Sequence, residues 1–241
     1  MRHIASETSG LIVPRECPCG REGAFLCTRC AGLLRVPPVR VDAVCDALQI
    51  VHRSRLRETP EGPAGVDHRA LLPVLALGEY SGDLQRLVLG WKNGGLAHLA
   101  RPMAQGLAPA VAMLCSGAQA PVLVPVPSRL EAQLRRGEHH TGELARALAR
   151  CTSARSSTVG LRLGHGQRGH GARERRGRSA VLTGTVPGGG PLILVDDVVT
   201  TGSTLRAVVQ ALRAGGAEVR GAVVVASARL PAPAAVPGSS R

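Results

Sequence analysis

Residues 192–205 read LILVDDVVTTGSTL, in which an apolar run leads into two aspartates and a hydroxyl-rich turn. The apolar run 192–195 follows the turn residues 187–191, a pattern typical of a strand buried on both faces of a parallel sheet. Beyond the turn, apolar residues recur with the spacing of an amphipathic helix: Leu205, Val208, Val209 and Leu212. We therefore expect the acidic and hydroxylated residues where a strand turns into a helix.

This junction has the composition of a phosphate site. Backbone N–H groups at a helix start lack partners and carry partial positive charge. Gly202 permits close approach of the backbone, and four hydroxyl groups surround it: Thr200, Thr201, Ser203 and Thr204. Asp196 and Asp197 repel a phosphate, so we expect them to face vicinal hydroxyls or a Mg²⁺ ion. Phosphate, hydroxyls and metal together describe a ribose 5-phosphate ligand.

Four of the seven cysteines lie within residues 17–30, CPCGREGAFLCTRC. Such clustering favours a metal over disulfides in a cytosolic protein. The spacing predicts a structural zinc site with four thiolate ligands: Cys17, Cys19, Cys27 and Cys30. Four cysteines leave no open position, which argues against catalysis by this metal. The other three cysteines are predicted to be small core residues: Cys45, Cys115 and Cys151.

The composition indicates a soluble protein with a basic surface. The net charge is +13 and Lys92 is the only lysine, so arginine carries nearly all the positive charge. Aromatic residues make up 1% of the chain, which favours attraction of a phosphorylated metabolite over a dedicated nucleic-acid face. No apolar run approaches the roughly 20 residues of a membrane span, and the N-terminus lacks a secretory signal pattern. We expect a cytoplasmic protein without membrane insertion.

Composition also divides the chain into parts. We predict a zinc-binding module at 1–50, a linker at 51–69 because residues 54–68 are rich in Pro, Gly and charge, and a disordered tail at 231–241. The principal domain would cover residues 70–230. Its first strand holds Pro73, which favours an edge or irregular strand.

Strand and helix patterns alternate through the principal domain. One helix has an apolar face at Leu84, Leu87, Val88 and Trp91. A second is indicated by Leu96, Leu99, Met103, Leu107, Val111 and Leu114, with Pro102 and Pro109 near its ends or bending it. A strand at 121–127, a helix at 141–150 and a last strand near 219–226 complete the pattern. This alternation predicts an α/β fold with a doubly wound, mostly parallel sheet that binds ligands beyond the carboxyl ends of its strands.

The 192–205 stretch resembles the phosphoribosyl pyrophosphate signature of type I phosphoribosyltransferases. The resemblance implies that Asp196 and Asp197 hold the ribose 2- and 3-hydroxyls while residues 200–204 wrap the 5-phosphate, with Mg²⁺ as cofactor. It extends over most of the chain to ComF proteins, competence-associated members of that family. The further segments that carry it are the cysteine cluster, GEYSGDLQRLVLGWKNGG (78–95), VLVPVPSRLEAQLRRGEHH (122–140) and Gln167 with a basic run.

The ComF resemblance assigns further roles. It implicates Ser128 and Arg129 in receiving pyrophosphate, although Arg129 equally suits a basic helix face with Arg135 and Arg136. Lys92 is either an ammonium aimed at a phosphate or an accident of composition. The arginine- and glycine-rich stretch 162–178 is predicted to be a mobile loop that closes over substrate, contacts DNA backbone or has no role.

Two functions follow from the resemblance. The first is transfer of a phosphoribosyl group to an unidentified nitrogen acceptor, an activity of the glycosyltransferase class. The second is a non-catalytic role in DNA uptake, with the pocket binding a phosphorylated metabolite or single-stranded DNA. Residues 136–140 read RGEHH where the family usually has Arg-Gly-Phe-Asn-Gln, so catalysis and the acceptor stay open. A homodimer and a partner in the uptake machinery are compatible with the family.

Overall fold

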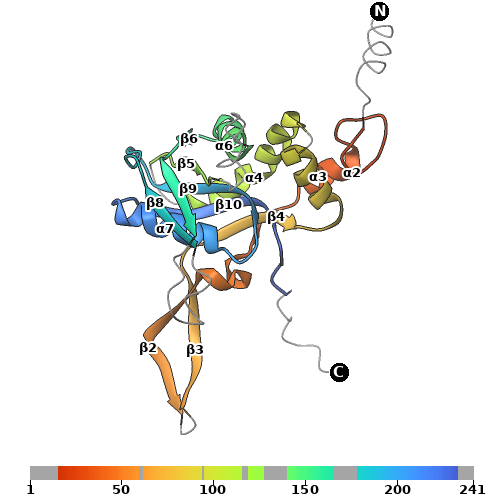
Figure 1. Ribbon diagram of the computed structural model, residues 1–241. Helices are drawn as coiled ribbons and strands as arrows, with labels where there is room; N and C mark the ends of the chain where they lie inside the picture. Colours follow the sequence, from red (N-terminus) through yellow and green to blue (C-terminus); the bar gives the residue numbers. More distant parts are fainter. Residues whose placement is uncertain are drawn as a thin grey trace, which may run out of the picture.

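A six-stranded sheet in the order β1-β4-β10-β9-β5-β6 lies at the centre of the molecule (Figure 1). This computed structural model describes residues 16–59, 62–93, 95–115, 119–127, 140–165 and 178–232. The strands are β1 (Val39–Arg40), β4 (Val74–Glu79), β5 (Val122–Pro125), β6 (Arg155–Ser156), β9 (Leu192–Val199) and β10 (Val219–Ser227). All neighbouring pairs are parallel except β1 with β4. The predicted α/β fold with a mostly parallel sheet is confirmed.

Helices follow the apolar periodicity of the sequence. They are α2 (Thr28–Leu33), α3 (Gly82–Asn93), α4 (Ala100–Leu114), α6 (His140–Cys151) and α7 (Ser203–Ala214), with short 3-10 turns η1 (Asp42–Val44), η2 (Asp46–Leu48) and η3 (Ala97–Leu99). The four residues predicted to form the apolar face of α3 are its buried residues, and Pro109 lies inside α4. The longest described helix has 15 residues, and none of the described helices has the length and apolar character to cross a bilayer.

Strand alternation divides the interior into two cores. One face of the sheet meets α2, α3, α4 and α6; its central strand residues are Leu75, Leu77, Leu123, Ile193, Val195, Val223 and Val225. The other face meets α7, η1 and η2; its strand residues are Val74, Ala76, Val122, Val124, Leu192, Leu194, Ala222 and Val224. Burial of both faces explains why the strands read as continuous apolar runs.

Antiparallel strand pairs occupy the predicted linker and the two ends of the predicted loop. Residues predicted as the linker 51–69 belong to the antiparallel strands β2 (Gln49–Thr59) and β3 (Gly62–Ala70), which extend away from the sheet (Figure 1). The loop prediction was wrong at this point because strand pairing satisfies backbone N–H and C=O groups whatever the side-chain charge. Both ends of 162–178 also lie in paired strands, β7 (Leu161–His165) and β8 (Arg178–Leu182). Residues 166–177 of that predicted loop lie outside the described residues.

Other expectations need correction. β4 lies between β1 and β10 rather than at the edge, because Pro73 precedes the strand and there offers only its carbonyl, which accepts the N–H of Ala222 at 3.0 Å. Cys45 is buried as predicted, but Cys115 is half-buried and Cys151 is exposed at the end of α6. Residues 1–15 and the tail 233–241 lie outside the described residues.

Candidate functional site

The two aspartates lie inside β9, which continues to Val199 instead of ending at residue 195. Parallel pairing with β10 extends the strand, since Asp196 pairs with Val224 and Val199 with Ser227. Asp197 lies on the α3 side of the sheet, where it meets Lys92, whereas one carboxylate oxygen of Asp196 accepts the N–H of Asp197 at 2.9 Å. The two predicted carboxylates therefore have different partners.

Asp197 forms an ion pair with Lys92 of α3. Lys92 Nζ lies 2.6 Å from Asp197 Oδ2, and the side chains are 31% and 9% exposed. The other carboxylate oxygen of Asp197 accepts the N–H of Val198 at 2.5 Å, which fixes the carboxylate group. The sequence predicts Asp197 as a ligand residue and Lys92 as either a phosphate ligand or an accident of composition, but it does not predict their pairing. A signal was present, since Lys92 is the only lysine and lies in the last turn of the helix that follows β4.

The turn after β9 has the predicted strand-to-helix geometry. Gly202 has φ +77° and is the N-cap residue of α7, which has no side-chain cap and no acidic residue in its first turn. Thr200 and Thr201 are exposed, while Ser203 and Thr204 open the helix. N–H groups and hydroxyls at the positive end of a helix can bind an anion, and here the Ser203 N–H donates to the Thr201 hydroxyl at 3.4 Å. We refer to residues 200–204 as the phosphate turn, after the ligand predicted for them.

The η1 and η2 turns hold this phosphate turn in place. The Ala47 N–H donates to the Thr201 carbonyl at 2.9 Å, and Arg206 Nη1 donates to the Ala47 carbonyl at 3.1 Å. A Cβ atom on Gly202 would come within 2.6 Å of Leu48 Cγ. Gly202 is therefore required both by its positive φ and by this close approach. The contact is not predictable from a local sequence pattern, because Ala47 and Thr201 are far apart in the chain.

An aromatic contact lies beside the ion pair. Trp91, the residue before Lys92, packs against His140 with ring centroids 5.7 Å apart at 65°. Trp91 Nε1 and His140 Nδ1 are buried and have no hydrogen-bond partner among the described residues. Thr141 donates its hydroxyl to the Val126 carbonyl at 3.0 Å and ties the start of α6 to the end of β5. The elements on this side of the site are thereby packed together.

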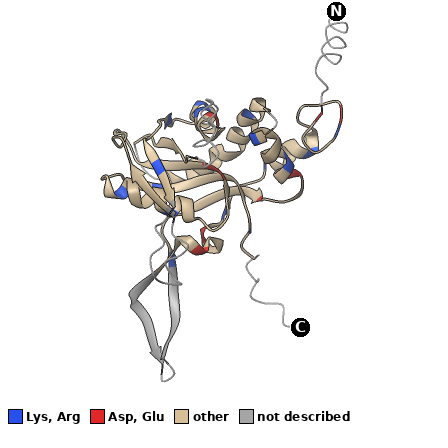
Figure 2. Ribbon diagram, viewed as in Figure 1, with Lys and Arg blue, Asp and Glu red and all other residues tan. Residues whose placement is uncertain are grey.

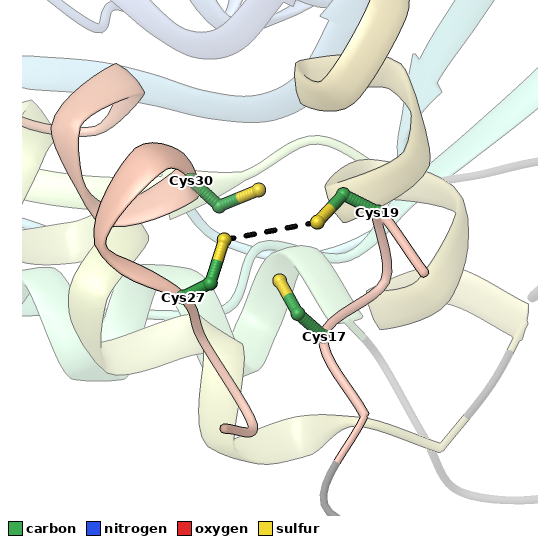
Figure 3. A group of neighbouring side chains, drawn as sticks. All are labelled: Cys17, Cys19, Cys27 and Cys30. Atoms are coloured by element: carbon green, nitrogen blue, oxygen red, sulfur yellow. Dashed lines mark hydrogen bonds between the residues drawn. The ribbon is translucent and has the colours of Figure 1, made fainter. Parts of the chain in front are cut away.

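The cysteine cluster fits a tetrahedral metal ion. The four sulfur atoms of Cys17, Cys19, Cys27 and Cys30 lie within 4.8 Å of one another and converge (Figure 3). Cys19 Sγ and Cys27 Sγ are 3.7 Å apart, close to the ~3.8 Å edge of a tetrahedron built from Zn–S bonds of about 2.3 Å. The short Cys17–Cys19 spacing is no obstacle to this arrangement. The cluster can therefore hold a metal ion through four thiolates.

The thiols of the cluster differ in acidity. The backbone N–H of Cys30 lowers the pKa of Cys27 to about 7. Burial raises the pKa of Cys30 above its ordinary value. A metal ion must displace the proton of the Cys30 thiol before it can bind the sulfur, so metal affinity is expected to rise with pH.

Several predicted site residues cannot be placed. Ser128 and Arg129, with Arg135, Arg136 and His139, lie outside the described residues. Basic residues of the described part are distributed over α2, α3, α4, α6 and α7 (Figure 2). A cleft of about 600 Å³ between α4 and α6 and one of about 630 Å³ beside α2 and α4 are not lined by any residue of β9 or the phosphate turn.

Comparison with known proteins gives one family match. The phosphoribosyl transferase domain family matches residues 165–234, which include β9, the phosphate turn, α7 and β10. No curated protein sequence matches the chain. The chain is therefore phosphoribosyltransferase-like in this region.

Solved structures show a more distant likeness. A hypoxanthine phosphoribosyltransferase from Staphylococcus aureus has 14% identity and a TM-score of 0.33, covering 54% of this chain and 60% of its own. A purine phosphoribosyltransferase from Pyrococcus horikoshii has 14% identity and a TM-score of 0.32, covering 57% and 74%. The chain thus spans about 60% of the length of the first of these proteins.

Proposed function

We propose that the protein binds phosphoribosyl pyrophosphate with Mg²⁺ at the carboxyl edge of β9 and transfers the phosphoribosyl group to a nitrogen acceptor. The observation that carries this proposal is that the family match covers a strand, acidic pair and uncapped helix start that together suit a ribose 5-phosphate. The 5-phosphate would lie at residues 200–204, where N–H groups and hydroxyls converge.

The described residues have separate tasks in this proposal. The phosphate turn binds the 5-phosphate and orients the sugar. Asp196 and Asp197 accept hydrogen bonds from the ribose hydroxyls, and Lys92 orients the Asp197 carboxylate. Lys92 neutralises Asp197, so that an anionic ligand meets no net negative charge on this side. Bound Mg²⁺ would neutralise charge that develops on the departing diphosphate. The role of Ser128 and Arg129 at that diphosphate stays a prediction.

The test is calorimetric titration with phosphoribosyl pyrophosphate and Mg²⁺. Wild-type protein is expected to bind, and Asp196→Asn/Asp197→Asn to lose binding, because neutral amides cannot replace the carboxylates. Glu218→Gln, an exposed carboxylate paired with Arg220 outside the site, is the matched control. Trp91 is the only tryptophan and adjoins Lys92, so its fluorescence gives an independent readout. A folded wild-type protein that does not bind the ligand would refute the proposal.

A second candidate function is ligand binding at the same site without catalysis. The ComF resemblance and the RGEHH sequence at 136–140, which departs from the family pattern, favour a binding protein of DNA uptake. Incubation of the bound ligand with candidate nitrogen acceptors separates the two functions. Release of pyrophosphate supports transfer, whereas an intact ligand with every acceptor tested supports binding alone. Titration with single-stranded DNA tests the uptake role directly.

A further inference from the structure

The cysteine cluster and the candidate ligand site contact the same helix. The cluster residues Cys17, Cys27 and Cys30 are buried in the core that also contains Leu87, Val88 and Trp91 of α3. Lys92, the next residue, is paired with Asp197. Helix α3 therefore lies between the two sites.

Gly90 makes the contact on the cysteine side. A Cβ atom at this position would lie 3.2 Å from Cβ and Cγ of Pro18, which stands between Cys17 and Cys19 in the chain. The Pro18 ring thus packs directly over the last turn of α3. Any metal bound by Cys17 and Cys19 fixes the residue between them, because both of its neighbours become ligands.

An ion pair makes a second contact at the other end of α3. Arg29 of α2 lies between Cys27 and Cys30, and its Nε is 2.8 Å from Asp83 Oδ2. Asp83 is 8% exposed and lies in the first turn of α3. Both halves of the cysteine cluster therefore hold α3, one at its start and one at its end.

We propose that metal occupancy of the cysteine cluster controls the ligand site through α3. With metal bound, Pro18 and Arg29 hold the helix so that Lys92 reaches Asp197. Without metal, Pro18 and Arg29 are no longer fixed, α3 loses its outer support and the Lys92–Asp197 pair loosens. Residues Pro18, Arg29, Asp83 and Gly90 are positioning residues in this scheme. The inference rests on the proposed function for its consequence at the ligand, but the movement of α3 does not depend on it.

Hydrogen exchange of the full chain tests the physical coupling. Removing zinc with a chelator is expected to raise exchange in α3, residues 82–93, while α7, residues 203–214, stays protected because it packs on the opposite core. Unchanged exchange in α3 would overturn the proposal, and so would equal loss of protection in α3 and α7, since the metal would then support the whole fold. This readout remains valid if the protein proves not to bind phosphoribosyl pyrophosphate.

A pair of glycine variants tests the same coupling with the metal in place. Gly90→Ala places a methyl group 3.2 Å from both Pro18 and Leu96 Cδ1, whereas Gly32→Ala of α2 places one in open space. Both exchange a helical glycine for alanine, so both gain helix propensity equally. With zinc content measured as equal, Gly90→Ala is expected to weaken phosphoribosyl pyrophosphate binding about fivefold or more and to shift Trp91 fluorescence, while Gly32→Ala leaves both unchanged. Equal affinity and equal fluorescence in the two variants would refute the coupling. If wild-type protein does not bind the ligand, the proposed function fails, and the fluorescence comparison still decides the coupling.

Discussion

At the residue scale, the candidate site depends on a few side chains and one glycine in unusual surroundings. Gly202 combines a positive φ with a close neighbour, Leu48, that belongs to a distant part of the chain. Cys45 lies in the same contact, with its Cβ 3.2 Å from the position of a Cβ on Gly202. Substitutions at these residues therefore report on the packing that supports the phosphate turn.

Gly202→Ala is expected to destabilise the protein more than Gly216→Ala. Both glycines have positive φ, +77° and +83°, but a Cβ on Gly216 meets no atom within 4 Å. The shared backbone strain is worth about 1 kcal/mol, and contact with Leu48 adds about 1–3 kcal/mol at Gly202 only. Urea unfolding of the two variants measures the difference. Equal free energies of unfolding in the two variants would contradict the prediction, since the Leu48 side chain would then accommodate the new methyl group without loss of stability.

Cys45 is expected to make stability fall at alkaline pH. Burial raises the pKa of Cys45 from 9.0 to about 11, with Asp42 and Asp46 contributing. Between these values the folded state keeps a proton that the unfolded state has lost, so the free energy of unfolding decreases as pH rises, by at most about 1.4 kcal/mol per pH unit. Cys45→Ser retains a donor for the Val41 carbonyl but does not titrate there.

The measurement is urea unfolding at several values between pH 8 and pH 11. Cys45→Ser should reduce the slope of unfolding free energy against pH. Cys151→Ser, at an exposed position, controls for the loss of a thiol. A slope that stays the same in Cys45→Ser would contradict the prediction.

At the element scale, helices were predicted from periodicity more reliably than strands and loops. The apolar face of α3 is local in the sequence and could be identified before the fold was known. The extension of β9 through the aspartates depends on pairing with β10, and the β2–β3 hairpin depends on pairing between two polar segments. Such pairings are not visible in a local pattern, because the partner supplies the hydrogen bonds.

Helix α3 offers a direct test of its buried face. Leu87 is fully buried and Leu89, two residues further, is 41% exposed. Leu87→Ala is expected to cost about 2–5 kcal/mol because it leaves a cavity, and Leu89→Ala to stay within about 0.5 kcal/mol. Chemical denaturation of both variants measures the two costs. A similar loss of stability in both would contradict the assigned orientation of the helix.

At the scale of the whole molecule, the N-terminal residues are part of both cores. Cys30 and Leu34 pack with the helices of one face, whereas Val41, Cys45 and Leu48 pack with α7 on the other. The chain crosses from one face to the other at β1, which pairs with β4. The ligand site is thereby supported from both faces by the segment that precedes it in the sequence.

Removal of residues 1–48 is therefore expected to prevent native packing of the rest. The shortened chain would expose apolar surface on both faces of the sheet, and we expect an aggregated or molten product. Near-ultraviolet circular dichroism of Trp91 and Tyr80 reports the packing. A chain lacking only residues 1–15 keeps every described residue and is the control. A cooperatively folded 49–241 fragment would show that the N-terminal segment is dispensable for folding.

The α/β class, the helix faces, the strand-to-helix turn at 200–204 and the grouping of four cysteines follow from the sequence alone, because each depends on the types and spacing of neighbouring residues. Only the tertiary structure shows the pairing of Lys92 with Asp197, the close approach of Leu48 to Gly202 and the packing of Pro18 on Gly90. These contacts join segments far apart in the chain. Their geometry follows from strand order and helix packing, which no local pattern contains.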